Sequence, residues 1–244
     1  MRLSIEEVGV TTRLVLWDID RTLLDTRGYG RELSADAFRK ATGMDMKRHV
    51  RVDGLTERVI FRETAKLHGL ATTHEDFEVF AKALAECHRR HRDILRNRSR
   101  ALPGAAAALE AVHKVKGIRQ TVVTGNIRGT AEVKLAALGL APYLDLVSGA
   151  YGDEHDNRSA LVALALRRAA CPPASAVLVG DTPHDVTAGL AQGVRVMAVA
   201  TGEFTEDELR AAGAHVVVSD LTVTRHVTSV LTGGEAPQPE LGHE

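Results

Sequence analysis

Residues 13–25 read RLVLWDIDRTLLD, an apolar stretch that runs directly into two aspartates placed two positions apart. Residues 14–17 have the composition of a buried parallel strand. Side chains two apart on an extended chain leave it on the same side, so Asp18 and Asp20 are expected to converge where the strand ends. Two neighbouring anions need a cation or a shared proton. An ordinary Asx-type turn would also explain the pair, so the rest of the chain must decide.

The composition indicates a globular protein that acts on small molecules. With 244 residues the chain can form one large domain, or a core with an inserted module. The 31 Lys and Arg residues nearly balance the 32 Asp and Glu residues, so we expect no nucleic-acid or membrane partner. The two cysteines, Cys87 and Cys171, and the absence of an apolar leader favour the cytoplasm. Monomer and homodimer are equally compatible with these features.

Short apolar strands alternate with amphipathic helices from residue 101 onward, and this alternation is typical of βαβ units. We therefore predict an α/β fold with a Rossmann-like parallel sheet and helices on both faces. The expected strands are 14–17, 121–123, 144–147, 176–179, 194–199 and 215–218. The expected helices are 104–116, 128–139, 158–170 and 184–192.

Residues 26–100 break this rhythm, because they contain no strand-like run and show apolar spacings of three and four. The block is too long for a simple crossover, so we predict an inserted all-helical cap over the strand ends. The remaining residues, 1–25 and 101–232, would form the core. The tail 233–244 is rich in Gly, Pro and Glu and is expected to be disordered.

Two further polar motifs follow predicted strands. Thr124, Gly125 and Asn126 come after one strand, and Asp181 and Asp185 lie in the segment VGDTPHD after another. Each motif alone could be a plain turn or a helix cap. In open α/β sheets, however, ligands bind at the carboxyl ends of the strands, and these two motifs and the Asp18–Asp20 pair all fall there.

These residue types suit the binding of a phosphate group with a metal ion. Carboxylates from two strand ends form a hard-oxygen site of the kind that Mg²⁺ prefers, together with waters and a substrate phosphate. The hydroxyl of Thr124 and the amides that follow it could donate to phosphate oxygens. Arg158, at the start of a predicted helix, is the best candidate for a permanent cation, although Arg128 competes with it.

In the order and type of these motifs the chain resembles hydrolases of the haloacid dehalogenase superfamily, over residues 14 to about 231. The similarity is to the phosphoglycolate-phosphatase-like group, which carries a helical cap after the first motif. The resemblance implies that Asp18 is the nucleophile and that Asp20 is the general acid and base.

The resemblance also implies the other site residues. The expected substrate contacts are Thr22, Thr124, Gly125, Asn126 and Arg158. The expected Mg²⁺ ligands are the carboxylate of Asp18, the backbone carbonyl of Asp20 and the carboxylate of Asp181. Asp185 is expected to bind the ion through a water molecule or to support the direct ligands. Two residues depart from the family pattern, since Arg21 stands where Gly is usual and Arg158 where Lys is usual.

The predicted function is Mg²⁺-dependent hydrolysis of a small phosphorylated metabolite through an aspartyl phosphate. A phosphomutase would keep the same core and differ in its cap. A haloacid dehalogenase would use Asp18 but needs neither a metal nor an acid and base, so Asp20 and Asp181 count against it. A non-catalytic binding or regulatory domain of the same fold would be expected to lack an essential carboxylate, and none is missing.

Three polar segments lie outside these motifs. Cys87, His88 and His91 sit among arginines, and we expect a solvated basic face there, not a zinc site. The acidic loop 153–156 is likewise expected to be solvated. Residues 53–58 are the polar segment expected nearest the pocket. Thr56 and Arg58 are expected to contact the leaving group and so to determine substrate preference.

Overall fold

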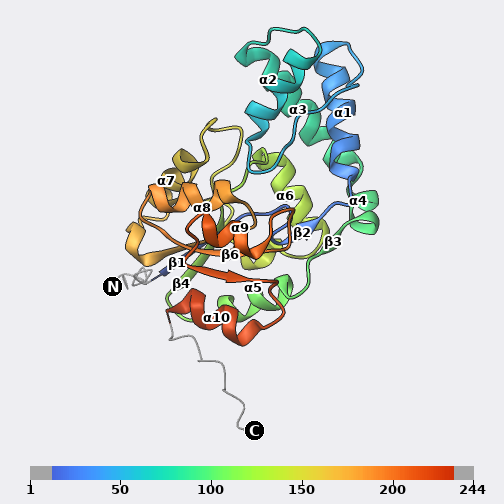
Figure 1. Ribbon diagram of the computed structural model, residues 1–244. Helices are drawn as coiled ribbons and strands as arrows, with labels where there is room; N and C mark the ends of the chain where they lie inside the picture. The colour runs from blue at the N-terminus through green and yellow to red at the C-terminus, as the bar shows by residue number, and fades with distance from the viewer. Residues whose placement is uncertain (1–12, 234–244) are drawn as a thin grey trace, which may run out of the picture.

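The computed structural model describes residues 13–233, so all but the first residue of the predicted disordered tail lies outside the described part. Its core is a five-stranded parallel sheet in the order β4-β1-β5-β6-β7 (Figure 1). The first strand along the chain therefore lies between β4 and β5. The strands are β1 (Arg13–Trp17), β4 (Ile118–Val122), β5 (Ala176–Gly180), β6 (Arg195–Val199) and β7 (Val216–Val218).

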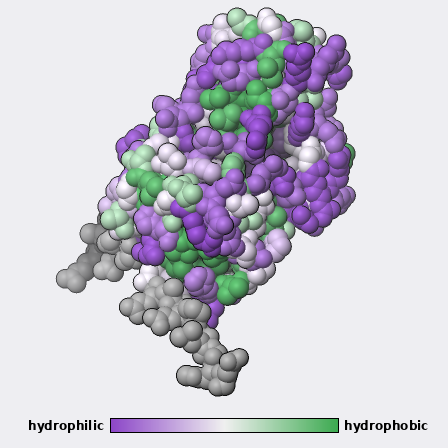
Figure 2. Space-filling model, in the orientation of Figure 1, coloured by the Kyte–Doolittle hydropathy of each residue, from purple (hydrophilic) through white to green (hydrophobic). Residues whose placement is uncertain are grey.

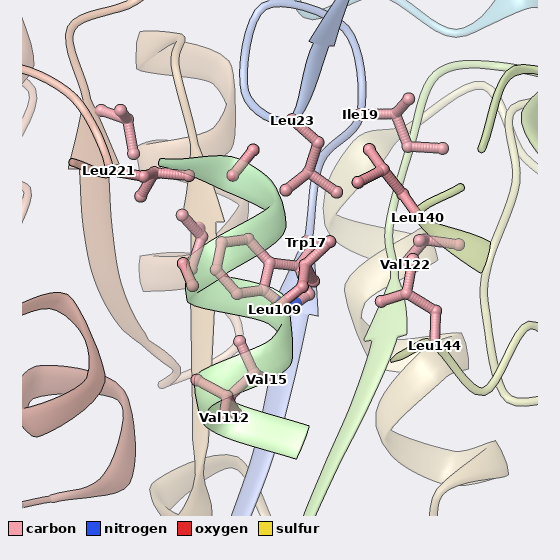
Figure 3. Packing of buried hydrophobic residues seen from close by; sticks show 14 of the residues in the cluster. Val15, Trp17, Ile19, Leu23, Leu109, Val112, Val122, Leu140, Leu144 and Leu221 are labelled. Carbon is pink, nitrogen blue, oxygen red and sulfur yellow. The ribbon is translucent and has the colours of Figure 1, made fainter. Parts of the chain in front are cut away.

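Alternating side chains of the sheet pack against helices on both faces, as predicted for this fold class. Val15 and Trp17 face one hydrophobic cluster, whereas Leu14 and Leu16 face the other. Figure 3 shows Trp17 packed against Leu109 in the first cluster. The first face is covered by α5 (Ala105–His113), α6 (Arg128–Ala137) and α10 (Thr224–Thr232), and the second by α7 (Arg158–Arg168), α8 (Pro183–Ala191) and α9 (Glu206–Ala211).

The predicted strand 144–147 is wrong. This segment follows the outer edge of β4, since the backbone N–H of Asp145 donates to the carbonyl of Gln120 at 2.8 Å. The carboxylate of Asp145 then accepts hydrogen bonds from the backbone N–H groups of Val147 (3.1 Å) and Ser148 (3.2 Å). A short polar side chain thus takes the backbone donors that a strand would need and turns the chain.

Residues 26–99, between two short strands, form a block of four helices that we call the helical insertion. β2 (Leu24–Asp25) pairs antiparallel with β3 (Arg100–Ala101) and joins this insertion to the core. These strands were not predicted, because two residues are too few to show a period. The helices are α1 (Tyr29–Thr42), α2 (Glu57–Leu67), α3 (His74–Arg90) and α4 (Arg92–Arg98), and Figure 1 shows α1 to α3 standing away from the sheet.

The helical insertion has an aromatic core of its own. Phe61 and Phe80 stack with ring centroids 4.6 Å apart, and Phe38 and Phe77 pack beside them. Ile127, which precedes α6, joins this cluster from the core of the protein. The insertion is therefore anchored on the loop that carries the second polar motif.

Hydrophilic residues cover most of the face seen in Figure 2, with smaller hydrophobic patches on both the insertion and the core. Among residues 13–233, no helix combines the length and apolar character needed to cross a bilayer.

Candidate functional site

The polar motifs meet at one edge of the sheet because β1 lies between β4 and β5. Asp18 directly follows β1, Asp181 directly follows β5, and Thr124 follows β4 by two residues. All three line a cavity of about 530 Å³ between the strand ends and the helical insertion. This volume is in the range of small-molecule sites.

Asp18, Asp181 and Asp185 form a buried acidic cluster, with carboxylate oxygens that lie within 4.8 Å of one another. Burial raises the pKa of Asp18 above its ordinary value, and the charges of Asp185 and Asp20 add to this while Arg158 opposes it. Burial raises the pKa of Asp181 as well, together with the charges of Asp18 and Asp185. Such a cluster calls for a counter-charge, and its oxygen donors are the kind that a hard divalent cation takes.

Arg158 supplies one permanent positive charge to this cluster. Its Nη2 lies 2.5 Å from Oδ1 of Asp18, and its Nε lies 2.6 Å from Oδ1 of Asp185. The side chain of Asn157 caps helix α7 just before it, accepting from the backbone N–H of Ser159 at 2.8 Å. The planar guanidinium therefore bridges two carboxylates, which a lysine ammonium cannot reproduce at both positions. The competing Arg128 lies outside the cavity lining and pairs with Glu132 at 2.8 Å.

The carboxylate of Asp20 is not part of the acidic cluster and is held by Lys134 instead. Nζ of Lys134 lies 2.9 Å from Oδ1 and 2.7 Å from Oδ2 of Asp20, and Nδ2 of Asn126 donates to the same Oδ2 at 2.7 Å. Burial pushes the pKa of Asp20 up, but the charge of Lys134 and these hydrogen bonds outweigh it. The pKa of Asp20 consequently lies below its ordinary value.

Sequence reasoning missed Lys134. A signal was present, because Lys134 falls on the buried stripe of α6 with Thr130, Ala131 and Leu135. Lysine is rarely buried unless it is paired, so a lysine within an apolar helix stripe predicts a nearby acidic partner. The partner itself could not be read from the sequence.

The hydroxyl groups of the motifs have different positions. Thr124 lines the cavity, and its Oγ1 accepts from the backbone N–H (3.2 Å) and from Nδ2 (2.8 Å) of Asn126. Thr22 does not line the cavity; its hydroxyl donates to Oδ1 of Asp181 at 3.1 Å. Thr22 therefore orients an acidic side chain and does not face the space where a substrate would lie.

Gly125 is the point where the helical insertion touches the second motif. Its carbonyl accepts from the backbone N–H of Glu57 at 2.8 Å. A Cβ at position 125 would lie 2.1 Å from the carbonyl oxygen of Leu55, so only glycine fits this close approach.

The expectation that Thr56 and Arg58 face the pocket is not met by their contacts. The hydroxyl of Thr56 donates to the carbonyl oxygen of Asp156 at 3.3 Å, and Nε of Arg58 lies 3.4 Å from Oδ1 of the same residue. Of this segment, Asp53, Gly54, Leu55 and Glu57 line the cavity. Burial raises the pKa of Glu57 to about 7, with Lys134 opposing and Asp20 and Asp153 adding to the shift.

Two segments that were expected to be solvated make specific contacts. His88 is 1% exposed and lines the cavity, because it falls on the face of α3 that also carries Leu84 and Cys87. Asp156 is tied to the insertion by Arg58 and by Arg62, whose Nη1 lies 2.6 Å from its Oδ2. The arginines beside His88 are exposed as predicted, so the prediction was wrong only for Cys87 and His88. Asp156 is exposed as well, but its arginine partners come from a distant part of the chain.

Arg21, at a position where the resembling family usually has Gly, adopts a left-handed backbone conformation with φ of 64°. Its half-exposed guanidinium lies 3.9 Å from Glu203. The backbone thus keeps the glycine-like geometry, and the bulky side chain points to the rim of the cavity.

Comparison with known proteins gives a family match that spans this site and relatives that match about half of the chain. Residues 15–199 match the family described as haloacid dehalogenase-like hydrolase. The phosphoglycolate phosphatase of Rhodospirillum rubrum is 34% identical over 119 residues, which are 48% of this chain and 48% of that protein. The pyrophosphatase PpaX of Bacillus velezensis is 30% identical over 118 residues, 48% of this chain and 55% of that protein. The chain thus spans about half the length of these curated relatives.

The fold is also found among solved structures. A hydrolase from Pseudomonas syringae aligns with a TM-score of 0.66 over 89% of this chain and 98% of its own length, at 21% identity. At this identity the similarity concerns the fold alone. It includes the helical insertion as well as the sheet, because the alignment covers most of both chains.

Proposed function

The chain belongs to the haloacid dehalogenase-like hydrolase family, and we propose that it is a Mg²⁺-dependent phosphatase that acts on a small phosphorylated metabolite. The observation that carries this proposal is the position of Asp18, which lies in the cavity between the guanidinium of Arg158 and the carboxylate of Asp181. The helical insertion would then act as a cap over the strand ends. The relatives named as phosphatases support the same class of reaction.

Asp18 is the proposed nucleophile. Arg158 holds its Oδ1, which leaves Oδ2 to attack phosphorus. The attack forms a bond between Asp18 and phosphorus and breaks the bond from phosphorus to the leaving oxygen, which takes a proton from Asp20. A carboxylate nucleophile divides one difficult phosphoryl transfer into two easier ones. Water then attacks phosphorus while Asp20 accepts its proton, and the bond to Asp18 breaks to release phosphate.

Lys134 keeps Asp20 in place for both steps. Its contacts to both oxygens of Asp20 favour the ionised carboxylate, which is the form needed to accept a proton from water. A bound phosphate ester brings negative charge beside Asp20 and raises its pKa towards the acid form needed in the first step. Asn126 limits rotation of the same carboxylate through its hydrogen bond to Oδ2.

The residues fit a divalent cation. Asp18 and Asp181 place buried carboxylate oxygens within 4.8 Å of each other, and the hydroxyl of Thr22 orients Asp181. These two carboxylates and the backbone carbonyl of Asp20 would hold Mg²⁺. Asp185 would not touch the ion but would position Arg158 and the start of α8 at Thr182. When bound, the ion neutralises charge on the phosphate oxygens.

The remaining motif residues would hold the phosphate group. Thr124 and Gly125 line the cavity and Arg158 offers guanidinium protons beside Asp18, whereas both amide protons of Asn126 already go to Asp20 and Thr124. Fixed donors around the equatorial oxygens stabilise the charge of a phosphoryl-transfer transition state.

Hydrolysis of p-nitrophenyl phosphate by the full chain tests this proposal. We expect activity with Mg²⁺, reversible loss in excess EDTA, and no turnover for Asp18→Asn. The same substitution at Asp145, which caps a turn outside the cavity, serves as the control and should retain activity. Wild-type protein quenched during turnover should carry a hydroxylamine-labile phosphate at Asp18. Full activity in EDTA would contradict the proposal and direct attention to metal-free dehalogenation of a 2-haloacid.

A further inference from the structure

One histidine of the helical insertion holds the loop that forms part of the cavity wall. This connecting loop, residues 43–56, joins α1 to α2 without a helix or strand of its own, and residues 49–55 all line the cavity. The backbone N–H groups of Lys47 and Arg48 donate to Nε2 of His68, at 2.9 Å and 3.3 Å. Among the described hydrogen bonds of residues 45–54, these are the two that reach another element.

The ring of His68 suits these contacts in one protonation state. Nδ1 lies 2.8 Å from the carbonyl oxygen of Thr64, which can only accept, so Nδ1 carries the proton. Nε2 then presents its lone pair to the two backbone donors of the connecting loop. The ring of Phe38 packs beside the imidazole, with centroids 5.1 Å apart, and keeps it in this orientation. All these partners therefore require the neutral form of the ring.

Protonation of His68 would break the attachment. A proton on Nε2 would point at two N–H donors, so both hydrogen bonds would be lost. The N–H of Lys47 would keep a second acceptor, the carbonyl of Asp45 at 3.0 Å, whereas that of Arg48 has none among the described residues. Imidazole changes its charge between about pH 5 and pH 8, so the loop would be released in mildly acidic solution.

The charged groups around the ring offer little to balance a positive imidazole. On the elements that contact it they are Asp45, Lys47 and Arg48 of the connecting loop, Arg39 of α1, and Glu63 and Lys66 of α2. Asp45 lies 4.0 Å from Arg39, and Glu63 lies 2.9 Å from Lys66, so both carboxylates already have a cation. His68 also caps the C-terminal end of α2, whose carbonyl groups favour a positive charge, so the ring can take up a proton there.

Other contacts of the connecting loop would survive the loss of its bonds to His68. Met46 packs against the aromatic core of the insertion. Gly54 passes so close to the core domain that a Cβ there would lie 2.4 Å from Cβ of His184. Release would therefore loosen the stretch between these two contacts, including residues 49–53 of the cavity wall, and leave the helices in place.

We propose that His68 is a positioning residue whose neutral ring holds residues 47–53 in the cavity wall and whose protonated ring releases them. His68 does not itself line the cavity, so it acts on a bound substrate through the connecting loop. The inference goes beyond the proposed phosphatase activity, and only its kinetic consequence rests on that function.

Hydrogen–deuterium exchange at the Arg48 amide tests the attachment in the full chain. Protection from exchange, corrected for the intrinsic rate at each pH, should fall at least about fivefold between about pH 8 and about pH 5.5 in the wild type. His68→Gln should stay protected at both pH values, because the amide oxygen of glutamine accepts a hydrogen bond without titrating. His68→Leu keeps an apolar contact with Phe38 but has no acceptor, so the Arg48 amide should be unprotected at both.

A second imidazole in the connecting loop provides the matched control. His49 lines the cavity, and burial lowers its pKa although its hydrogen bond to the carbonyl of Val50 opposes the shift. His49→Gln should leave the pH response of the Arg48 amide as in the wild type. The ring nitrogens of His68, observed by NMR, give an independent check. We expect a proton on Nδ1 alone near pH 8 and protons on both nitrogens at about pH 5.5.

The kinetic consequence is measured with p-nitrophenyl phosphate and Mg²⁺, comparing proteins at the same pH so that ionisation of the substrate cancels. The KM values of the wild type and His68→Gln should agree within about twofold at pH 8, and the wild-type value should be at least about threefold higher at pH 5.5. The apparent affinity falls with the fraction of molecules whose loop is in place, whereas kcat should change less because the reacting groups belong to the core. His74→Gln, at an exposed histidine that pairs with Glu78, should match the wild type.

The outcomes separate this inference from the proposed function. Equal protection of the Arg48 amide at both pH values in the wild type, or a loss that persists in His68→Gln, would overturn the inference. A pH response that disappears in His49→Gln would assign the release to His49 instead. If p-nitrophenyl phosphate is not hydrolysed, the proposed function fails while the exchange data still decide on His68. Should His68→Gln not fold by circular dichroism, wild-type exchange and the ring nitrogens of His68 decide.

Discussion

The ammonium group of Lys134 lies 2.7 Å from one carboxylate oxygen of Asp20 and 2.9 Å from the other. The Lys134 side chain is 8% exposed and that of Asp20 is 38% exposed, so this ion pair joins helix α6 to the loop after β1 with the ammonium group shielded from water. In this arrangement the proposed acid and base is oriented by the fold before any substrate arrives. Preorganised groups of this kind need no rearrangement at the moment of reaction.

Lys134→Met should lower kcat for p-nitrophenyl phosphate by about tenfold to a hundredfold, since general acid and base catalysis contributes about 10²–10⁴ and the carboxylate loses its orientation. Lys134→Arg should recover part of the loss, because the charge is kept. The control is Lys114→Met, at an exposed lysine that pairs with Glu110. Equal kcat for the two methionine variants would contradict the role of Lys134.

Arg158→Ala should lower kcat/KM by at least about a hundredfold, because removing one partner of a buried ion pair costs about 3–5 kcal/mol. Arg158→Lys should recover only part, since one ammonium cannot occupy the positions of both Nη2 and Nε beside Asp18 and Asp185. Arg128→Ala should stay close to the wild type. Steady-state kinetics with p-nitrophenyl phosphate measure all three variants. A larger loss of kcat/KM for Arg128→Ala than for Arg158→Ala would show that Arg128 supplies the positive charge beside Asp18.

The metal-free protein should become less stable as the pH rises. Asp18 and Asp181 have pKa values raised above the ordinary 3.8, so above that pH the folded state binds more protons than the unfolded state. The free energy of unfolding must then fall with increasing pH until both groups are ionised. Thermal unfolding in EDTA should show Tm decreasing between about pH 5 and pH 8.

Two further measurements check that the acidic cluster causes this slope. Mg²⁺ should raise Tm more at high pH than at low pH, because it binds the ionised carboxylates. Asp181→Asn should flatten the decrease in EDTA, since it removes one of the repelling charges. A Tm that rises with pH in EDTA would contradict the shifted pKa values.

Ala170→Gly should stabilise the protein by about 0.5–1 kcal/mol. Ala170 follows the cap of α7 with φ of 48°, and the backbone N–H of Cys171 donates to the carbonyl of Leu166 in a Schellman-type ending that favours glycine. Ala163→Gly, in the middle of the same helix, should instead destabilise by about 1 kcal/mol. Urea unfolding of the two variants measures both effects, and a loss for Ala170→Gly would contradict the backbone assignment.

The sequence was sufficient to predict the sheet edge but not the wall that faces it. Asp18, Thr124 and Asp181 each follow a periodic apolar run, so topology alone brings them together. Lys134 stands in the apolar stripe of α6, which indicates an acidic partner but not which one. The helix contact through Gly129 that brings α3 beside α6 joins segments distant in sequence. The false strand 144–147 arose because period and composition do not reveal how the side chain of Asp145 will bond.

Asp156 ties the helical insertion to the core through Arg58 and Arg62, and it lies two residues before Arg158. The turn that carries the guanidinium at Asp18 is thus the same turn that holds the insertion against the cavity. Movement of the insertion would displace the start of α7 and with it Arg158. Opening of the cavity is therefore linked to the ion pair between Arg158 and Asp18. Because the ion pairs of Asp156 are partly exposed, dissolved ions weaken them. We therefore expect ionic strength to set how often the cavity opens.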